Sequence, residues 1–230
     1  MYTLHIGNKN YSSWSLRPWV LMTTLGIPFH EEFHAFPPEG SSKSFRKFSP
    51  TGLVPVLEDG HQRVWESLGI VEYLAEAHPE VWPADKTARA WARSVASEMH
   101  GGFSALRNIC GVNVGIRVTL KAYPDSLKKD VGRIDELWTE GLTRFGGPFL
   151  AGAKFTAVDA FFCPVAYRIR TYGLKLGPAA TAYYERLIAL PSMQAWEAAA
   201  LKEDFRDKPH EDEHIAAGEW TADYRTPVKA

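Results

Sequence analysis

The sequence predicts an α/β domain over residues 1–80, followed by an all-helical domain over residues 85–230. Strand-like and helix-like segments alternate in the first part, and no convincing strand follows them. The segment between the two parts, residues 78–85, carries Pro79 and Pro83 and indicates a linker. A mixed sheet with helices followed by a helical domain is therefore the expected architecture.

The N-terminal elements are expected in the order βαβαββα. Gly26 suits the position after a helix, and Pro28 follows it as a stop signal. Asp59 and Gly60 separate two short apolar runs, which is a strong hairpin signal. The expected elements are strands at 2–6, 29–36, 54–57 and 63–65, and helices at 15–25, 42–48 and 67–78.

The second half of the chain has helical periodicity. Thr156 and Asp159 form a capping-box pattern before a stretch that is apolar nearly all round, which predicts a central buried helix. From about Lys202 the composition turns polar and acidic, which predicts a loosely held tail. The expected helices are 87–116, 126–145, 158–172, 179–190 and 192–201.

Composition is typical of a globular protein in water, with 45% hydrophobic and 23% charged residues. A formal net charge of −1 gives no general attraction for nucleic acid or for an anionic membrane, so neither is an expected partner. No membrane-spanning run or secretory signal is visible. Cys110 and Cys163 lie in apolar helical surroundings, which predicts buried, reduced thiols and a cytoplasmic protein.

Serines cluster where the first strand gives way to the first helix, at Ser12, Ser13 and Ser15. Hydroxyl side chains there can cap the helix and leave backbone N–H groups free. The helix dipole adds positive potential, so the junction favours an anion such as a thiolate. No cysteine lies here, so a thiolate must arrive on a ligand. Plain helix capping is the alternative interpretation.

Two later corners extend this pattern. Val54 precedes Pro55 at a strand start, and a cis bond there would present the Val54 N–H and C=O to a peptide-like ligand. A trans edge proline is the alternative. Ser67 can cap the next helix beside N–H groups that suit a carboxylate, while Glu66 can pair with an ammonium. Together the three sites suit a thiol, an amide backbone and an amino-acid head group.

Over nearly its whole length the chain resembles the glutathione S-transferase family, with its thioredoxin-like N-terminal domain and helical C-terminal domain. The Ser-Ser-Trp-Ser-Leu-Arg run is similar to the serine motif of the zeta and tau classes, in which a serine stands five residues before an arginine. Counting back from Arg17 gives Ser12. The resemblance implies that Ser12 stabilises the glutathione thiolate, with Ser13 and Ser15 as weaker candidates.

Other segments carry the same resemblance. Residues 51–57 match the cis-proline segment, which implies that Val54 and Pro55 bind the cysteinyl backbone of glutathione. Glu66 and Ser67 match the pair that holds the γ-glutamyl end. Residues 155–159 match the structural motif that starts the central helix of the helical domain. Leu53 replaces a basic or amide residue common in the family, so the candidates for the glycine carboxylate are Lys43, Arg46 and Lys47.

The resemblance implies a detoxifying transferase that conjugates glutathione, its co-substrate, to a hydrophobic electrophile. It also implies a homodimer, and no metal. The candidate electrophile pocket consists of Trp14, His100, Phe103, Arg107 and Tyr167, each with ordinary helix packing as the alternative. Two other functions remain open: a glutathione-dependent isomerase of the maleylacetoacetate type, and a non-catalytic glutathione-binding scaffold.

The run from His210 to His214 matches the H-E-x-x-H pattern of zinc proteases. That chemistry requires a helix with both imidazoles on one face and a third ligand elsewhere. The run follows a proline in an acidic segment, so a solvated run of charges is the preferred interpretation.

Overall fold

A four-stranded mixed sheet forms the first part of the molecule, as predicted. The computed structural model describes residues 1–37 and 41–227. The sheet order is β2-β1-β3-β4, with β1 parallel to β2 and antiparallel to β3. The predicted βαβαββα order is confirmed. Its elements are β1 (Tyr2–Ile6), α1 (Ser13–Leu25), β2 (Phe29–Phe33), α2 (Ser41–Phe45), β3 (Val56–Asp59), β4 (Gln62–Trp65) and α3 (Ser67–Ala77).

Local capping chemistry sets the limits of α1. Ser12 is its N-cap, and the Ser12 hydroxyl accepts a hydrogen bond from the Ser15 N–H. Gly26 ends the helix with φ of 71°, a left-handed conformation that glycine adopts without steric cost. The β3–β4 hairpin turns at Gly60, which has φ of 58°. These positions agree with the signals in the sequence.

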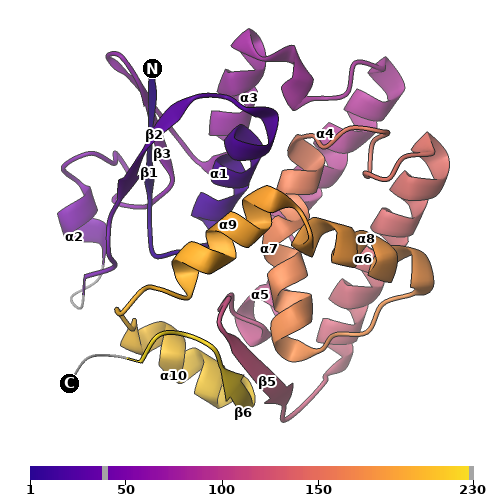
Figure 1. Ribbon diagram of the computed structural model, residues 1–230. Helices are drawn as coiled ribbons and strands as arrows, with labels where there is room; N and C mark the ends of the chain where they lie inside the picture. The colour runs from indigo at the N-terminus through magenta and orange to yellow at the C-terminus, as the bar shows by residue number, and fades with distance from the viewer. Residues whose placement is uncertain (38–40, 228–230) are drawn as a thin grey trace.

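The second part of the molecule is a set of helices arranged around α7. Thirteen residues from Ala157 to Ile169 are all buried, and α7 packs against α1, α4 and α8 (Figure 1). The capping box before α7 is present, because the Thr156 N–H donates to Asp159 Oδ2 at 2.9 Å. The elements are η1 (Pro79–Val81), α4 (Lys86–Gly101), α5 (Ser104–Ile109), α6 (Asp125–Phe145), α7 (Ala157–Tyr172), α8 (Pro178–Ile188) and α9 (Pro191–Ala200).

The expectation of a single helix over 87–116 is wrong, because the helix ends at Gly101 and a second one begins at Ser104. Gly102 is extended, and a Cβ atom there would lie 2.7 Å from the Glu98 carbonyl oxygen. Phe103 then adopts a left-handed conformation with φ of 60° before α5 begins. Gly102 therefore permits a sharp turn between α4 and α5.

The helical part also contains two strands that the sequence did not reveal. They are β5 (Ile116–Leu120) and β6 (Gly218–Asp223), which pair antiparallel, and α10 (Lys208–Ala217) immediately precedes β6. Figure 1 shows α10 and β6 beside β5, below α9. We call residues 202–227 the C-terminal arm. The predicted helical domain is confirmed, and it carries this two-stranded sheet in addition.

The C-terminal arm is firmly attached, which corrects the expectation of a loosely held tail. Several of its acidic residues have partners: Glu211 and Asp223 both pair with Arg225, at 2.7 Å in each case. Glu203 accepts hydrogen bonds from the backbone N–H groups of Lys9 and Asn10, at 2.6 and 3.2 Å. Because these charges are paired, a polar segment can pack against the rest of the protein. Residues 228–230 of the predicted tail lie outside the described residues.

Two further expectations concern the cysteines and membrane spans. Cys110 and Cys163 are free and buried, as predicted. In the described ranges, 1–37 and 41–227, the helices are too short or too polar to cross a membrane.

Candidate functional site

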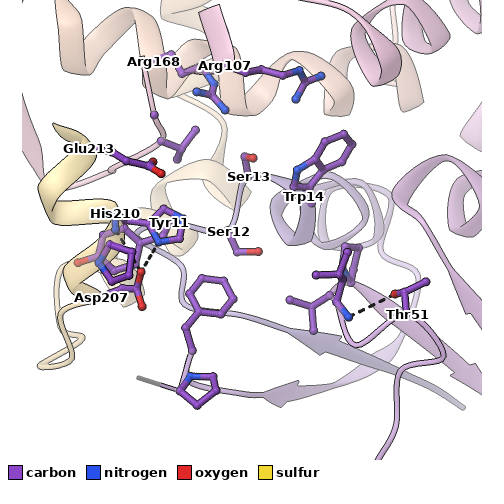
Figure 2. Close-up of a pocket in the computed structure, with 18 of the residues that line it drawn as sticks. Tyr11, Ser12, Ser13, Trp14, Thr51, Arg107, Arg168, Asp207, His210 and Glu213 are labelled. Carbon is purple, nitrogen blue, oxygen red and sulfur yellow. Dashed lines mark hydrogen bonds and ion pairs between the residues drawn. The ribbon is translucent and has the colours of Figure 1, made fainter. Parts of the chain in front are cut away.

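A cavity of about 690 Å³ lies where the start of α1, the loop before β3 and the C-terminal arm meet. Figure 2 shows residues from all three regions directed into it. Its lining contains Tyr11, Ser12, Ser13 and Trp14 at the start of α1; Phe36, Pro37, Thr51, Leu53, Val54, Pro55 and Glu66 from the α/β part; Arg107, Gly111, Val112 and Arg168 from the helical part; and Asp207, Pro209, His210 and Glu213 from the arm.

The three candidate serines take different positions. Ser12 and Ser13 line the cavity, whereas Ser15 is fully buried behind them. The Ser12 hydroxyl donates to the Ser15 hydroxyl at 2.7 Å, and Ser15 also accepts from the Gly7 N–H at 3.2 Å. Ser15 therefore anchors the Ser12 side chain to the β1–α1 loop. It does not itself face the cavity.

Val54 and Pro55 line the cavity and are joined by a cis peptide bond. Within the described ranges, the Val54 N–H and C=O are not paired with another backbone group. The loop before them is held by Ser49, whose hydroxyl accepts from the Leu53 N–H at 3.1 Å and donates to the Leu53 carbonyl at 2.6 Å. Two backbone groups of an ordered loop are thus available to a ligand.

Glu66 occupies the corner before α3 and lines the same cavity. Its backbone has φ of 65°, which is uncommon for a residue with a side chain. The expectation that Ser67 caps α3 is wrong, because Glu66 is the N-cap residue and Ser67 is inside the helix. The Ser67 hydroxyl is buried and accepts from Arg17 Nη1 at 3.3 Å. No side chain caps α3 among the described residues, so its first N–H groups stay open to an anion.

The three basic residues expected to meet the glycine carboxylate lie elsewhere. Lys43, Arg46 and Lys47 are exposed, and none is in the described cavity lining. The Arg46 guanidinium donates to the Pro50 carbonyl instead. The structure therefore does not bring these side chains to the cavity.

Two of the five candidate electrophile-pocket residues, Trp14 and Arg107, line the cavity. His100 lies just outside it, with its ring centroid 5.1 Å from that of Trp14. Tyr167 is buried, and its hydroxyl donates to the Met193 carbonyl at 2.7 Å, which is a packing role. The remaining candidate, Phe103, is buried at the turn before α5.

Three arginines gather at one side of the cavity: Arg107 and Arg168 line it, and Arg17 contacts Trp14 without lining it. The Arg17 guanidinium carbon lies 4.3 Å from the Trp14 ring centroid, and that of Arg107 lies 4.8 Å from it. Arg168 is 5% exposed and donates to the Cys110 carbonyl. Burial lowers the pKa of Arg168 to about 10, and the neighbouring positive charge of Arg107 acts in the same direction. Burial also holds the pKa of Arg17 well below its usual range.

Sequence analysis missed the contribution of the C-terminal arm. His210 Nδ1 lies 2.5 Å from Asp207 Oδ2, and the His210 ring stacks on those of Tyr11 and Phe36, at 5.1 and 5.7 Å. The Tyr11 hydroxyl donates to Glu211 at 2.7 Å. The sequence showed only the polar composition of this segment and the H-E-x-x-H pattern, and neither carries information about partners that are distant in the chain.

The H-E-x-x-H run is part of α10, so its interpretation as a solvated charge run is wrong for its second histidine. His214 is fully buried, and its Nδ1 lies 2.9 Å from the Tyr172 hydroxyl. Across residues 1–37 and 41–227, no group of three or more His, Cys, Asp or Glu side chains is arranged to hold a metal ion.

Comparison with known protein families shows which family this chain belongs to. Residues 11–77 match the glutathione S-transferase N-terminal domain, and residues 96–191 match the glutathione S-transferase C-terminal domain. The chain belongs to the glutathione S-transferase family. The matched segments contain the serine cluster, the Val54-Pro55 corner and the Glu66-Ser67 corner of this transferase-family protein.

A relative from the fungus Beauveria bassiana, the glutathione S-transferase-like protein OpS6, is 26% identical over 81% of this chain and 85% of its own length. A diazinon-metabolizing glutathione S-transferase of the silkworm Bombyx mori shares the fold with a TM-score of 0.69 at 19% identity, covering 87% of this chain and 97% of that one. A Burkholderia glutathione transferase homologue with bound glutathione gives a TM-score of 0.64 at 22% identity, covering 86% and 97%.

Proposed function

We propose that this member of the glutathione S-transferase family conjugates the glutathione thiolate to an electrophile. The observation that carries the proposal is the arrangement of Ser12, Val54 and Glu66 around one cavity. These residues offer a hydroxyl donor, two free backbone groups and a carboxylate, which match the thiol, peptide and amino-acid parts of glutathione.

In the proposed complex, the Val54 N–H and C=O hydrogen-bond the cysteinyl backbone. The Glu66 carboxylate pairs with the γ-glutamyl ammonium, and the open N-terminus of α3 at Ser67 receives the γ-glutamyl carboxylate. The glycine carboxylate extends toward Lys43, Arg46 and Lys47 outside the cavity lining. This arrangement leaves the sulfur beside Ser12.

Ser12 would activate the thiol by donating its hydroxyl hydrogen bond to the sulfur, giving up the bond to Ser15. Lowering the thiol pKa by two units requires about 2.7 kcal/mol. One charge-assisted hydrogen bond of about 1.5 to 3 kcal/mol together with the N-terminal dipole of α1 supplies that amount. The thiol proton leaves to solvent, and the thiolate attacks the electrophilic carbon.

Replacing Ser12 tests the proposal directly. We expect Ser12→Ala to bind glutathione almost as wild type does, while kcat falls by about a hundredfold or more because the thiolate loses its donor. Thiolate absorbance of the bound glutathione, titrated against pH, should show a raised thiol pKa. Ser12→Thr keeps the hydroxyl and should retain most of the turnover.

Ser13→Ala is the matched control, because Ser13 lines the same cavity without capping α1. Wild-type turnover in Ser12→Ala together with a large loss in Ser13→Ala would transfer the role to Ser13. Absence of glutathione binding to the wild-type protein would reject the proposed function. Consumption of glutathione distinguishes conjugation from isomerisation, which regenerates it.

We further propose that the enzyme is a cytoplasmic homodimer that acts in detoxification. Family membership supports the dimer, and the two free, buried cysteines fit a reducing compartment.

A further inference from the structure

Neither of the two arginine side chains of the cavity, Arg107 and Arg168, forms an ion pair among the described residues, although Asp130 lies near enough to Arg107 to raise the pKa of its guanidinium against the effect of burial. Arg107 directs Nε to the Gly102 carbonyl at 2.8 Å and Nη2 to the Met99 carbonyl, which leaves Nη1 open. Arg168 directs Nη1 to the Cys110 carbonyl, and its buried Nε has no hydrogen-bond partner in the described chain. Figure 2 shows both guanidinium groups on the same side of the cavity, with that of Arg107 above Trp14.

This arrangement is costly without a ligand. A buried charge needs a counter-charge, and Arg107 and Arg168 repel each other as well as Arg17. Glu213 lines the same cavity, but no ion pair joins it to either arginine within the described ranges. An anion bound between the two guanidinium groups would satisfy both the open donors and the excess positive charge.

The anion would belong to the second substrate. Under the proposed function, on which this inference rests, both ends of glutathione lie on the side of Val54 and Glu66. Figure 2 places Arg107 and Arg168 across Ser12 and Ser13 from Thr51, which belongs to the loop that leads to Val54. The guanidinium groups therefore face the space that the electrophile occupies.

We propose that Arg107 and Arg168 select electrophiles that carry a carboxylate. A guanidinium offers a planar fork of N–H donors that matches the two oxygens of a carboxylate. Trp14 lines the same cavity beside Ser13, with the Arg107 guanidinium carbon 4.8 Å from its ring centroid, and its indole adds apolar surface next to the arginines (Figure 2). The cavity thus combines an anion anchor with a surface for an unsaturated or aromatic group.

The test compares one electrophile in two forms: a para-chloro-dinitrobenzoate, with both nitro groups flanking the chlorine, and its methyl ester. In each reaction a carbon–sulfur bond forms, the carbon–chlorine bond breaks, chloride leaves with the electron pair, and the thiol proton goes to solvent. Each kcat/KM is divided by the uncatalysed rate constant with glutathione. The wild type should favour the acid by about tenfold or more, as expected for charge-assisted hydrogen bonds.

Arg168→Gln and Arg107→Gln should each lower kcat/KM for the acid by about tenfold to a hundredfold while changing the ester by less than about threefold. The affinity for glutathione, measured by calorimetry, should not change. Arg170→Gln is the matched control on the same helix, because Arg170 pairs with Glu197 at 2.8 Å outside the cavity. It should leave the ratio of acid to ester as in wild type.

Three results would overturn the inference. A wild-type preference for the ester would show that the arginines do not select an anion. Weaker glutathione binding in both variants, with an unchanged acid-to-ester ratio, would assign the arginines to glutathione itself. If the wild type binds glutathione but turns over neither form of the electrophile, calorimetry should measure the binding of the chlorine-free dinitrobenzoate to the protein. Absence of that binding would reject the inference. Failure of the wild type to bind glutathione would instead reject the proposed function and this inference with it.

Discussion

Asp159 shows how one side chain can organise a loop and a helix together. It is fully buried and accepts hydrogen bonds from the Leu150 N–H at 3.0 Å, the Thr156 N–H at 2.9 Å and the Tyr183 hydroxyl at 2.7 Å. Burial raises the pKa of Asp159 to about 6, while these hydrogen bonds act in the opposite direction. The carboxylate therefore ties α7 to the preceding loop and to α8.

We expect Asp159→Ala to lower the free energy of unfolding by about 3 to 5 kcal/mol, because two buried N–H groups lose their acceptor and a cavity forms. Urea unfolding followed by circular dichroism would measure the change. Tyr183→Phe removes only one donor and should cost about 1 to 2 kcal/mol. A loss below 1 kcal/mol in Asp159→Ala would contradict the structural role.

At the scale of single residues, the sequence also predicted those cavity residues whose positions depend on local backbone geometry. Ser12 lies at a strand-to-helix junction and Val54 precedes a proline, and both line the cavity. Lys43 was predicted to bind the glycine carboxylate from its charge alone, and charge does not determine where a side chain points. Asp207 and His210 reach the cavity through long-range contacts, which no local pattern in the sequence records.

At the scale of elements, the C-terminal arm forms one wall of the cavity and is joined to α1 by a charged network. Glu211 accepts from the Tyr11 hydroxyl and pairs with Arg225, whose Nη1 donates to that same hydroxyl at 3.0 Å. Tyr11 directly precedes Ser12. The position of the arm is therefore coupled to the position of the serine.

Arg225→Gln should loosen the arm, because Glu211 and Asp223 would lose their buried counter-charge. We expect faster amide hydrogen exchange in α10 and β6, and a KM for the electrophile raised by about tenfold. Lys208→Gln is the control, since Lys208 pairs with Asp212 at 2.6 Å on the exposed face, where an ion pair contributes little. Unchanged exchange in Arg225→Gln would show that the network does not hold the arm.

Local signals in the sequence predicted the order of strands and helices in the α/β part, but they did not predict the structure of the C-terminal arm. Apolar alternation, Gly26 and the Asp59-Gly60 turn act within a few residues, so periodicity reveals them. The β5–β6 pair joins Val118 to Trp220 across a long stretch of chain, and each strand alone is too short to identify. The polar arm is buried by pairing its charges, an effect that hydropathy cannot detect.

At the scale of the whole molecule, His214 makes stability depend on pH. Burial is the main cause that lowers its pKa to about 4 from the usual 6.5; Glu211 opposes this shift, and His210, Arg168 and Arg225 add to it. The unfolded chain binds a proton below about pH 6.5, whereas the folded protein binds it only near pH 4. The stabilisation is complete above pH 6.5 and is lost as the pH falls through this window.

We expect the free energy of unfolding to fall by as much as about 3 kcal/mol between pH 6.5 and pH 4 from this group alone. The measurement is the difference in pH dependence between wild type and His214→Gln, which cannot be protonated. Asp159 acts in the opposite direction in acid, because its pKa is raised by folding, and it cancels in this difference. Parallel pH curves for the two proteins would exclude His214 as the cause.

The contact between Tyr11 and Arg225 joins residues separated by 214 positions in the sequence. A contact of such long range forms late in folding, since the loop between the two residues must first be ordered. A ribosome-bound chain that has not yet reached residue 225 can complete its sheet while one wall of the cavity is still missing. Competence to hold a small ligand thus requires that residue 225 has been synthesised, well after the residues of the sheet.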